Sequence, residues 1–478
     1  MDESMTAEDL APGAVEGAAA PVVPRSQLTF HDASNPSLLP EPAPLEMPVQ
    51  DFSARSERVW PRRRGPGIPR TAVFLGAALM TFAFAYELYG VLSFVQMTPF
   101  QLLFLVLSTI TFAWISVGTL SAALGFLPLF AGEKADTVAI PDADGPLGTR
   151  TALLFPVYHE DPARISGTIS AIVEELTSLG KASAFDIFVL SDTRGADAGV
   201  AEEAAYAALS RKLAGEAKVY YRRRIENTAR KAGNIKDWVE RFGGAYETFV
   251  IFDGDSIMSG VALARLARAM EKDPSAGLIQ TVPKLIGGTT LLQKLMQFAA
   301  NVYGPPTAAG LAFWSQDQGN YWGHNAIIRT AAFAGAAGLP HLPGPTPFGG
   351  HIMSHDFVEA MLLQRAGWGV HMAPSIEGSF ESMPPALTDL IVRDRRWSQG
   401  NIQHLALITK PGVPGMGRMH LLMGALSYIV SAIWAGSLAV GLVLALQGQQ
   451  LLPSYFTDSK TLFPIWPVID PGAALRLF

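Results

Sequence analysis

The stretch TFVIFDGDS, residues 248–256, places two aspartates directly after a run of apolar and β-branched residues. Such a run is typical of a buried β-strand. Side chains two apart on an extended chain point the same way, so Asp253 and Asp255 can face one cation, and Gly254 lets the backbone come close. Carboxylates suit Mg²⁺ or Mn²⁺, which also take phosphate oxygens. The stretch predicts a metal–diphosphate site; the alternative is a turn capped by an aspartate.

Four similar runs predict further strands of the same sheet. They are TALLFPV (151–157), FDIFVL (185–190), AKVYY (217–221) and GLIQTV (277–282). Stretches with helical periodicity lie between them, and this alternation indicates a mostly parallel α/β sheet. Ligands of such sheets bind at the carboxyl ends of the strands. The residues that follow each strand are therefore the first candidates for a site.

Polar residues follow two of these strands, and a basic stretch follows a third. Tyr158 and Glu160 come after the first strand, and Asp192 comes after the second. Residues 222–240 contain several arginines and the motif KAGN, in which Lys231 could open a helix at a nucleotide. Each feature alone could be a solvated loop or an ordinary basic surface. Their shared position at one sheet edge favours a ligand site.

The stretch FGGHIMSHDFVEAML, residues 348–362, offers a carboxylate at the start of a helix. Asp356 could act as a general base that faces an acceptor hydroxyl, or it could cap the helix. His351 and His355 are four apart, so a metal site of these two histidines and Asp356 is a further alternative. The nearby glycines favour a loop over that metal site.

The stretch RDRRW, residues 393–397, combines charge with an aromatic ring. Arg396 can hold a phosphate with two hydrogen bonds, and Trp397 offers a flat face on which a sugar could stack. The alternative is a belt at a membrane interface, where arginine and tryptophan are also enriched.

Composition indicates a membrane protein without thiol chemistry. The chain has 478 residues, 49% of them hydrophobic, a mean hydropathy of +0.23, a net charge of −6 and no cysteine. The net charge indicates no nucleic-acid partner, and no disulfide or thiolate site can form. Three apolar runs predict membrane helices, with buried core helices as the alternative. The first starts near Thr71 and includes Glu87 close to its far end, and the other two cover 99–130 and 419–446. Arginines precede the first and third helices, which places the N-terminus and the central domain in the cytoplasm.

These features divide the chain into four parts. Residues 1–68, rich in Ala, Pro and Glu, predict a disordered cytoplasmic tail. Residues 69–132 hold two membrane helices, and residues 133–410 form the cytosolic α/β domain. Residues 411–478 comprise an interfacial segment, a membrane helix and a periplasmic end.

Assembled in order, the motifs resemble those of the processive, membrane-embedded family 2 glycosyltransferases, the cellulose synthase-like enzymes. The resemblance covers about residues 150–440. It implies a GT-A (Rossmann-like) glycosyltransferase domain inserted between transmembrane helices. It also implies that Glu160 and Asp192 bind the uridine, with Tyr158 and Lys231 nearby, and that the D-x-D motif binds Mg²⁺ or Mn²⁺.

The remaining motifs match the family in part. The family motif TED reads SHD here, which keeps Asp356 as the base. The family motif Q-x-x-R-W keeps Arg396 for the diphosphate and Trp397 for the acceptor, and Arg393 replaces the glutamine. The stretch YWGHNAIIR (321–329) resembles the acceptor-side strand, which implies acceptor contacts from His324 and Asn325.

The departures argue against a cellulose synthase and favour the branch that builds osmoregulated periplasmic glucans. The resemblance then implies UDP-glucose as donor, a growing β-1,2-linked glucan as acceptor, export across the bacterial inner membrane and contact with periplasmic glucan-processing proteins. Other β-glycans, transfer to a lipid phosphate and a non-catalytic membrane protein remain alternatives. Relatives of this kind carry further membrane helices, so we expect a chain ending at Phe478 to be truncated.

Overall fold

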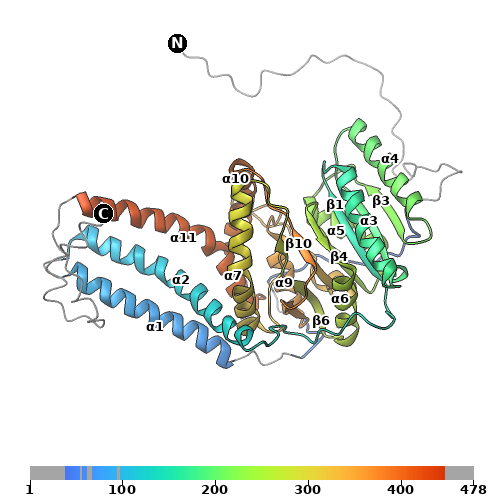
Figure 1. The fold of residues 1–478 in the computed structure, drawn as a ribbon. Helices are drawn as coiled ribbons and strands as arrows, with labels where there is room; N and C mark the ends of the chain where they lie inside the picture. Colours follow the sequence, from blue (N-terminus) through green and yellow to red (C-terminus); the bar gives the residue numbers. More distant parts are fainter. Residues whose placement is uncertain (1–37, 54–55, 62–66, 94–96, 447–478) are drawn as a thin grey trace, which may run out of the picture.

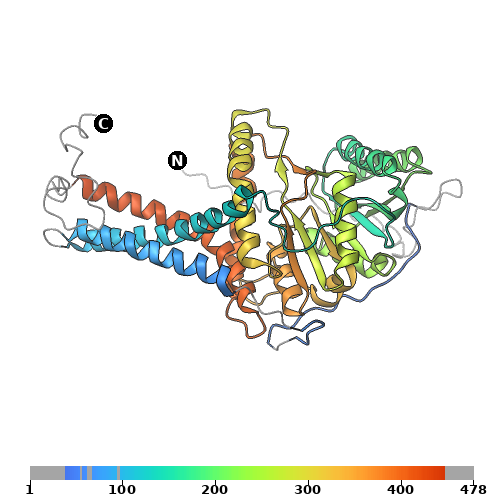
Figure 2. The same ribbon diagram turned by 60° about the horizontal axis from the view of Figure 1, so that its bottom comes forward.

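The computed structural model describes residues 38–53, 56–61, 67–93 and 97–446 of the chain. Three long helices run side by side away from a sheet-containing domain (Figures 1 and 2). They are α1 (Gly67–Leu92), α2 (Pro99–Phe130) and α11 (Gly415–Leu446). All three are long and apolar enough to cross a membrane. They agree with the three predicted membrane helices, although α1 and α11 each begin four residues earlier than expected.

A seven-stranded sheet forms the centre of the domain. Its order is β3-β2-β1-β4-β8-β6-β9, and every neighbouring pair is parallel except the two pairs made by β8. The strands are β1 (Thr151–Val157), β2 (Phe185–Ser191), β3 (Lys218–Arg223), β4 (Thr248–Ile251), β6 (Ala276–Thr281), β8 (Ala326–Arg329) and β9 (Gly369–Ala373). The five predicted strands and the mostly parallel sheet are confirmed, with strand ends shifted by at most two residues.

Helices cover both faces of this sheet. One face packs on α3 (Pro162–Ser178), α4 (Ala196–Lys212) and α6 (Gly260–Lys272). The other face packs on α5 (Arg230–Phe242), α8 (Thr330–Ala336) and α9 (His355–Arg365). Because both faces are covered, β2 and β4 are buried at every position, which explains their continuous apolar sequences.

A small second sheet and two more helices lie toward the apolar helices. The sheet has the order β5-β10-β7, formed by β5 (Ser256–Met258), β7 (Lys284–Leu285) and β10 (Ser379–Glu381). The helices are α7 (Leu291–Ser315) and α10 (Leu387–Gln403). In both views α7 lies between the three apolar helices and the large sheet (Figures 1 and 2). This placement puts α7 and α10 at the junction between the two parts of the molecule.

The segment before α1 differs from the predicted disordered tail. Residues 38–53 and 56–61 lie on the domain in extended form, and Met47 and Phe52 are buried there. The backbone is also tied down, because the Ala43 amide donates to the Arg241 carbonyl at 2.9 Å. The Pro-rich composition suggested disorder, but the scattered apolar side chains find places in the domain core. Residues 1–37 of the predicted tail lie outside the described residues, as does the predicted periplasmic end from 447 onward.

Candidate active site

The predicted site residues after β1 and β4 meet where the strand order reverses. These strands are parallel neighbours, and the chain continues to opposite sides of the sheet from them, so their carboxyl ends border a crevice. The Glu160 side chain lies against the DGD turn: a Cβ atom added to Gly254 would be 2.7 Å from Glu160 Cγ. Glu160 also accepts a hydrogen bond from the Tyr158 amide. The glycine of the motif is therefore needed for close approach of the two loops.

Asp253 is an ionised carboxylate that remains open to a ligand. Burial would raise the pKa of Asp253, but the charges of Lys231 and His324 hold it at about 2. Lys231 Nζ donates to the Asp253 carboxylate and to the Gly323 carbonyl, the latter at 2.8 Å. The Asp253 side chain is still 42% exposed. Lys231 thus lies beside the D-x-D motif and joins it to the loop before β8.

Asp255 has a different environment from Asp253. Burial and the neighbouring charge of Asp253 raise the pKa of Asp255. The described residues contain no group of three His, Asp or Glu side chains that could hold a metal. Two carboxylates on one turn suit a divalent cation that takes the rest of its ligands from phosphate and water, as Mg²⁺ does. Such a cation would also favour the ionised form of Asp255.

Asp192 is held by an arginine that the sequence did not single out. Arg224 Nε and Nη2 each donate to one Asp192 carboxylate oxygen at 2.7 Å. The Asn227 amide donates to the Asp192 carbonyl at 2.5 Å, and the Asp192 amide donates to the Val157 carbonyl at 2.8 Å. Asp192 is therefore fixed at the crevice, but both of its carboxylate oxygens already have a cationic partner.

The loop before β8 turns sharply around His324. Gly323 and Asn325 have φ values of +90° and +49°, in the left-handed region. His324 Nε2 lies 3.2 Å from a Glu381 carboxylate oxygen. Burial disfavours the charged ring, but Asp253 and Glu381 outweigh it and raise the pKa of His324. A histidine beside the D-x-D motif whose charged form is favoured suits an anionic ligand.

Asn325 does not fit the predicted acceptor contact. Its side chain is fully buried, and its amide nitrogen donates to Ser379 Oγ at 3.0 Å and to the Phe380 carbonyl at 3.2 Å. These bonds join the large sheet to β10. Asn325 is a structural residue, and a buried amide cannot contact a sugar from solvent.

Asp356 lies in the first turn of α9 and faces the same loop. A Cβ atom added to Gly323 would be 3.5 Å from Asp356 Oδ2. Burial raises the pKa of Asp356, and the charge of Glu359 adds to this increase. A carboxylate with a raised pKa is a suitable general base. The helix begins at His355, so Asp356 is inside its first turn rather than at the preceding cap position.

The alternative metal site of two histidines and Asp356 does not form. His355 Nδ1 pairs with a Glu359 oxygen at 3.0 Å. The ring of His351 packs edge to face on His341, with 4.9 Å between ring centroids. The two histidines thus have separate partners.

Helix α10 brings the RDRRW motif to the site. Gly400 packs so closely on the start of α9 that an added Cβ would be 2.3 Å from Ser354 Oγ. On α10, Arg396 is exposed and Trp397 is 46% exposed. Tyr428 of α11 donates to Asp394 at 3.1 Å. Helix α10 therefore contacts both the α9 turn that carries Asp356 and an apolar helix, so the site and membrane-interface interpretations of RDRRW are compatible.

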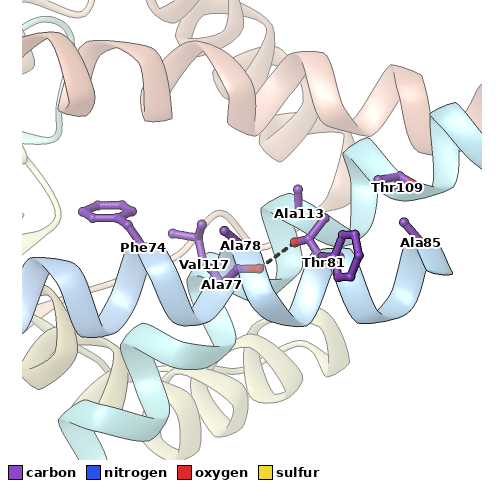
Figure 3. Close-up of a pocket in the computed structure, with 9 residues that line it drawn as sticks. Phe74, Ala77, Ala78, Thr81, Ala85, Thr109, Ala113 and Val117 are labelled. Carbon is purple, nitrogen blue, oxygen red and sulfur yellow. Dashed lines mark hydrogen bonds between the residues drawn. The ribbon is translucent and has the colours of Figure 1, made fainter. Parts of the chain in front are cut away.

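A separate groove of about 520 Å³ lies between α1 and α2 (Figure 3). Its lining residues come from another part of the sequence than the carboxylates of the candidate site. Its lining includes Phe74, Ala78, Ala113 and Val117. The hydroxyl of Thr81 points back to the Ala77 carbonyl at 2.7 Å. The groove carries no charge and has no group for sugar or phosphate chemistry, so it does not compete with the carboxylate crevice.

Comparison with known proteins shows which families the chain is similar to. Residues 153–335 match the sequence profile of "Glycosyl transferase family 2", and residues 248–464 match that of "Glycosyl transferase family group 2". Over these residues the chain is similar to family 2 glycosyl transferases. The D-x-D motif lies inside both matches, and Asp356 and Trp397 lie inside the second. The predicted fold class is thereby confirmed.

Named relatives align with nearly the whole chain. The "Glucans biosynthesis glucosyltransferase H" of Shewanella baltica (strain OS185) is 45% identical over 449 residues, which are 92% of this chain and 61% of that protein. The protein of the same name from Vibrio cholerae serotype O1 (strain ATCC 39315 / El Tor Inaba N16961) is 45% identical over 457 residues, with the same shares. The chain thus spans about three fifths of the length of these relatives.

A solved structure with a similar chain is the "Mannosyltransferase PcManGT from Pyrobaculum calidifontis in complex with GDP-Man and Mn2+". It is 15% identical, has a TM-score of 0.46, and the match covers 78% of this chain and 92% of that one.

Several partners in the site were missed by sequence reasoning. Glu381, which pairs with His324, lies in a three-residue strand that gives no sequence signal. Glu359 is four residues after His355 on one helix, a spacing that could have revealed the pair. Arg224 was visible only as one of many cations, although it binds Asp192 on both carboxylate oxygens.

Proposed function

We propose that the chain is an inverting, processive glucosyltransferase that uses UDP-glucose to build the β-1,2-linked backbone of periplasmic glucans. The observation that supports this proposal is a chain of contacts. Lys231 binds Asp253 and the Gly323 carbonyl, Gly323 lies beside Asp356, and the start of α9 packs on α10, the helix that carries Trp397. The names of the relatives, at 45% identity, support glucan synthesis.

The donor would lie along the crevice between β1 and β4. Asp253 and Asp255 would hold Mg²⁺ or Mn²⁺ together with the diphosphate, and the bound cation would neutralise charge on the leaving group. Arg396, exposed and without an ion-pair partner among the described residues, is free to bind phosphate oxygens. The uridine would contact Tyr158 and Glu160, with Asp192 and Lys231 shaping its surroundings.

The acceptor would approach from the α10 side. Trp397 would hold the end of the glucan, and Asp356 would take the proton from the acceptor hydroxyl. That oxygen then forms the new bond to the anomeric carbon from the face opposite UDP, while the bond to the diphosphate breaks. One proton moves to Asp356, and UDP leaves with the electron pair. Because the acceptor attacks from the face opposite UDP, the step inverts the anomeric configuration.

The bacterial inner membrane is the proposed location. Arg70 at the start of α1 and Arg418 near the start of α11 mark the ends that face the domain, in accord with the positive-inside rule. The catalytic domain and the N-terminus would then lie in the cytoplasm. Contact with the bilayer, the glucan chain and periplasmic glucan-processing proteins, together with export, belongs to the same proposal.

Incubation of the purified protein in detergent with UDP-[¹⁴C]glucose and Mg²⁺ tests this function. We expect a polymer that a β-1,2-glucanase digests and a cellulase does not. A cellulase-sensitive polymer would contradict the linkage but keep the reaction. Label that extracts into organic solvent would indicate transfer to a lipid phosphate instead. Hydrolysis of no UDP-sugar with either cation would overturn the enzymatic proposal.

A further inference from the structure

A buried glutamate on α4 connects to the donor side of the crevice. Glu202 is 2% exposed and accepts hydrogen bonds from three hydroxyl groups. They come from Ser191 at 2.6 Å, from Thr193, and from Tyr221 at 3.2 Å. In the described part of the chain Glu202 has no cationic partner. Burial of a carboxylate that has only hydroxyl partners costs desolvation free energy. Packing alone therefore does not explain why a glutamate occupies this position.

The hydroxyls bound to Glu202 also bind backbone amides. Thr193 Oγ1 accepts from the His159 amide at 2.9 Å, and Ser191 Oγ accepts from the Thr193 amide at 3.1 Å. Each hydroxyl has one proton. Because a carboxylate only accepts, each hydroxyl donates its hydrogen bond to Glu202 and leaves its lone pairs for the amide. Glu202 thereby fixes the orientation of both hydroxyl groups.

These bonds hold the two loops that carry the nucleotide-binding candidates. Ser191 and Thr193 lie on either side of Asp192, and His159 lies between Tyr158 and Glu160. His159 has a φ of +64°, in the left-handed region that few residues other than glycine adopt. The Arg194 amide gives further support, since it approaches His159 Nε2 at 3.4 Å.

We propose that Glu202 is a positioning residue for nucleotide binding. It acts through Thr193 and Ser191 to keep the Tyr158–Glu160 loop and Asp192 in register with each other. The role rests on the proposed function, because it assumes that a uridine diphosphate sugar occupies this crevice. Glu202 itself touches no substrate, and its effect is on donor affinity rather than on the chemical step.

The substitution Glu202→Gln tests the role with almost no change of volume. The amide of glutamine donates as well as accepts, so at least one hydroxyl must reverse its hydrogen bond. We expect a rise of about tenfold in the KM for UDP-glucose and in the Kd for UDP, the equivalent of one lost hydrogen bond. The kcat should stay within about twofold, because Asp356 and the D-x-D motif are untouched.

Substitutions at Thr193 separate positioning from general stability. Thr193→Val removes the link to His159 and should match Glu202→Gln, whereas Thr193→Ser keeps the hydroxyl and should restore near-normal affinity. The double variant Glu202→Gln/Thr193→Val should be little worse than either single one, because both break the same link.

Tyr246→Phe is the matched control. Tyr246 also donates a buried hydroxyl to a carboxylate, Asp186, at 2.7 Å, but at the opposite end of β2. The Tyr246→Phe variant should lower the thermal unfolding midpoint about as much as Glu202→Gln does, without changing UDP affinity. If it weakens UDP binding as much as Glu202→Gln does, the effect of Glu202 is general stability and the proposal fails.

Calorimetric titration with UDP keeps this proposal distinct from the proposed function. A wild-type protein that binds UDP but makes no glucan would overturn the function and leave the affinity comparison intact. Unchanged UDP affinity in Glu202→Gln and Thr193→Val would overturn the role of Glu202, whatever the turnover. A wild-type protein that binds no UDP would overturn both.

Discussion

The guanidinium of Arg393 lies over the ring of Trp397, 4.5 Å from the ring centroid. One face of the proposed acceptor platform is thus occupied by a residue that replaces the glutamine of the family motif. The guanidinium is also anchored by a contact of 3.4 Å between Arg393 Nη2 and the Met383 sulfur. Arg393 therefore holds the Trp397 ring from one side, and the proposed acceptor would use the other face.

The first prediction concerns this pair. Arg393→Gln removes a cation–π contact that holds the ring, so acceptor binding should weaken by about threefold to tenfold. Donor affinity should change little. Measurement of initial rates against glucan acceptor concentration, with UDP-glucose held at saturation, checks this. The control is Arg395→Gln, an exposed arginine on the same helix; equal effects of the two variants would show that only net charge matters.

The second prediction is that Asp356→Asn abolishes transfer but keeps UDP binding. The asparagine cannot accept the acceptor proton, whereas the proposed diphosphate ligands are unchanged. Radiolabel incorporation and UDP calorimetry measure the two properties separately. Asp389→Asn, at an exposed carboxylate in the first turn of α10, is the control. Normal turnover by Asp356→Asn would show that another group is the base.

The raised pKa of Asp356 adds two consequences that can be measured. The ionised base is lost as pH falls, and this loss should begin above the usual range of an aspartate, so kcat should decline in mildly acidic buffer. The native state also binds this proton more tightly than the unfolded chain does. The contribution of Asp356 to the free energy of unfolding therefore decreases as pH rises through the native pKa of this carboxyl group. Asp356→Asn should accordingly raise the unfolding midpoint at neutral pH; a lower midpoint would contradict the cause given for the pKa.

The third prediction is that Gly254→Ala weakens donor binding and leaves the fold intact. The added methyl group would lie 2.7 Å from Glu160 Cγ, so the Glu160 side chain must move away from the D-x-D turn. An increase in the Kd for UDP, with an unchanged circular dichroism spectrum, is expected. Gly167→Ala on α3 is the control, because nothing lies within 4 Å of its added Cβ. Unaltered UDP affinity in Gly254→Ala would show that donor binding does not depend on the position of the Glu160 side chain.

The strands and the carboxylates at their ends could be predicted because both depend on local patterns. Continuous apolar runs mark strands that are covered on both faces, and the DGD motif follows one directly. Asn325 could not be assigned in this way, since its burial depends on β10, more than fifty residues later in the chain. Glu202 was hidden for a similar reason: on α4 it resembles any helical glutamate until Ser191 and Thr193 are brought to it by the sheet.

The N-terminal segment shows the limit of composition as a guide to order. Its sequence has many prolines and alanines, which predicted a tail, yet single apolar residues decide its position. Met47 enters the core beneath α5 and α8, and Phe52 enters a second cluster formed with α9 and the start of α11. A few isolated apolar side chains are enough to hold an extended segment on a domain, and such residues leave no periodic pattern in the sequence.

The fourth prediction tests the anchor at Phe52. Its ring is 7% exposed and lies 5.7 Å from the Arg365 guanidinium, which also donates to the Asp51 carbonyl. Phe52→Ala should destabilise the domain by about 3 kcal/mol, because it removes a buried ring and leaves a cavity. Thermal unfolding in detergent should show a lower midpoint. Limited proteolysis should cut near residue 52 sooner. The reason is that the hydrogen bond from the Gly412 amide to the Phe52 carbonyl, 3.2 Å long, would open more often.

The matched control for this anchor is Val49→Ala. Val49 lies three residues earlier on the same segment but is 59% exposed, so its truncation should change stability by less than about 0.5 kcal/mol. The KM for UDP-glucose should be unchanged in both variants, since Phe52 packs on α9 behind the turn that carries Asp356. Equal unfolding midpoints for Phe52→Ala and Val49→Ala would mean that the segment does not stabilise the domain. A selective loss of turnover in Phe52→Ala, without loss of stability, would instead show that the segment acts on Asp356 through α9.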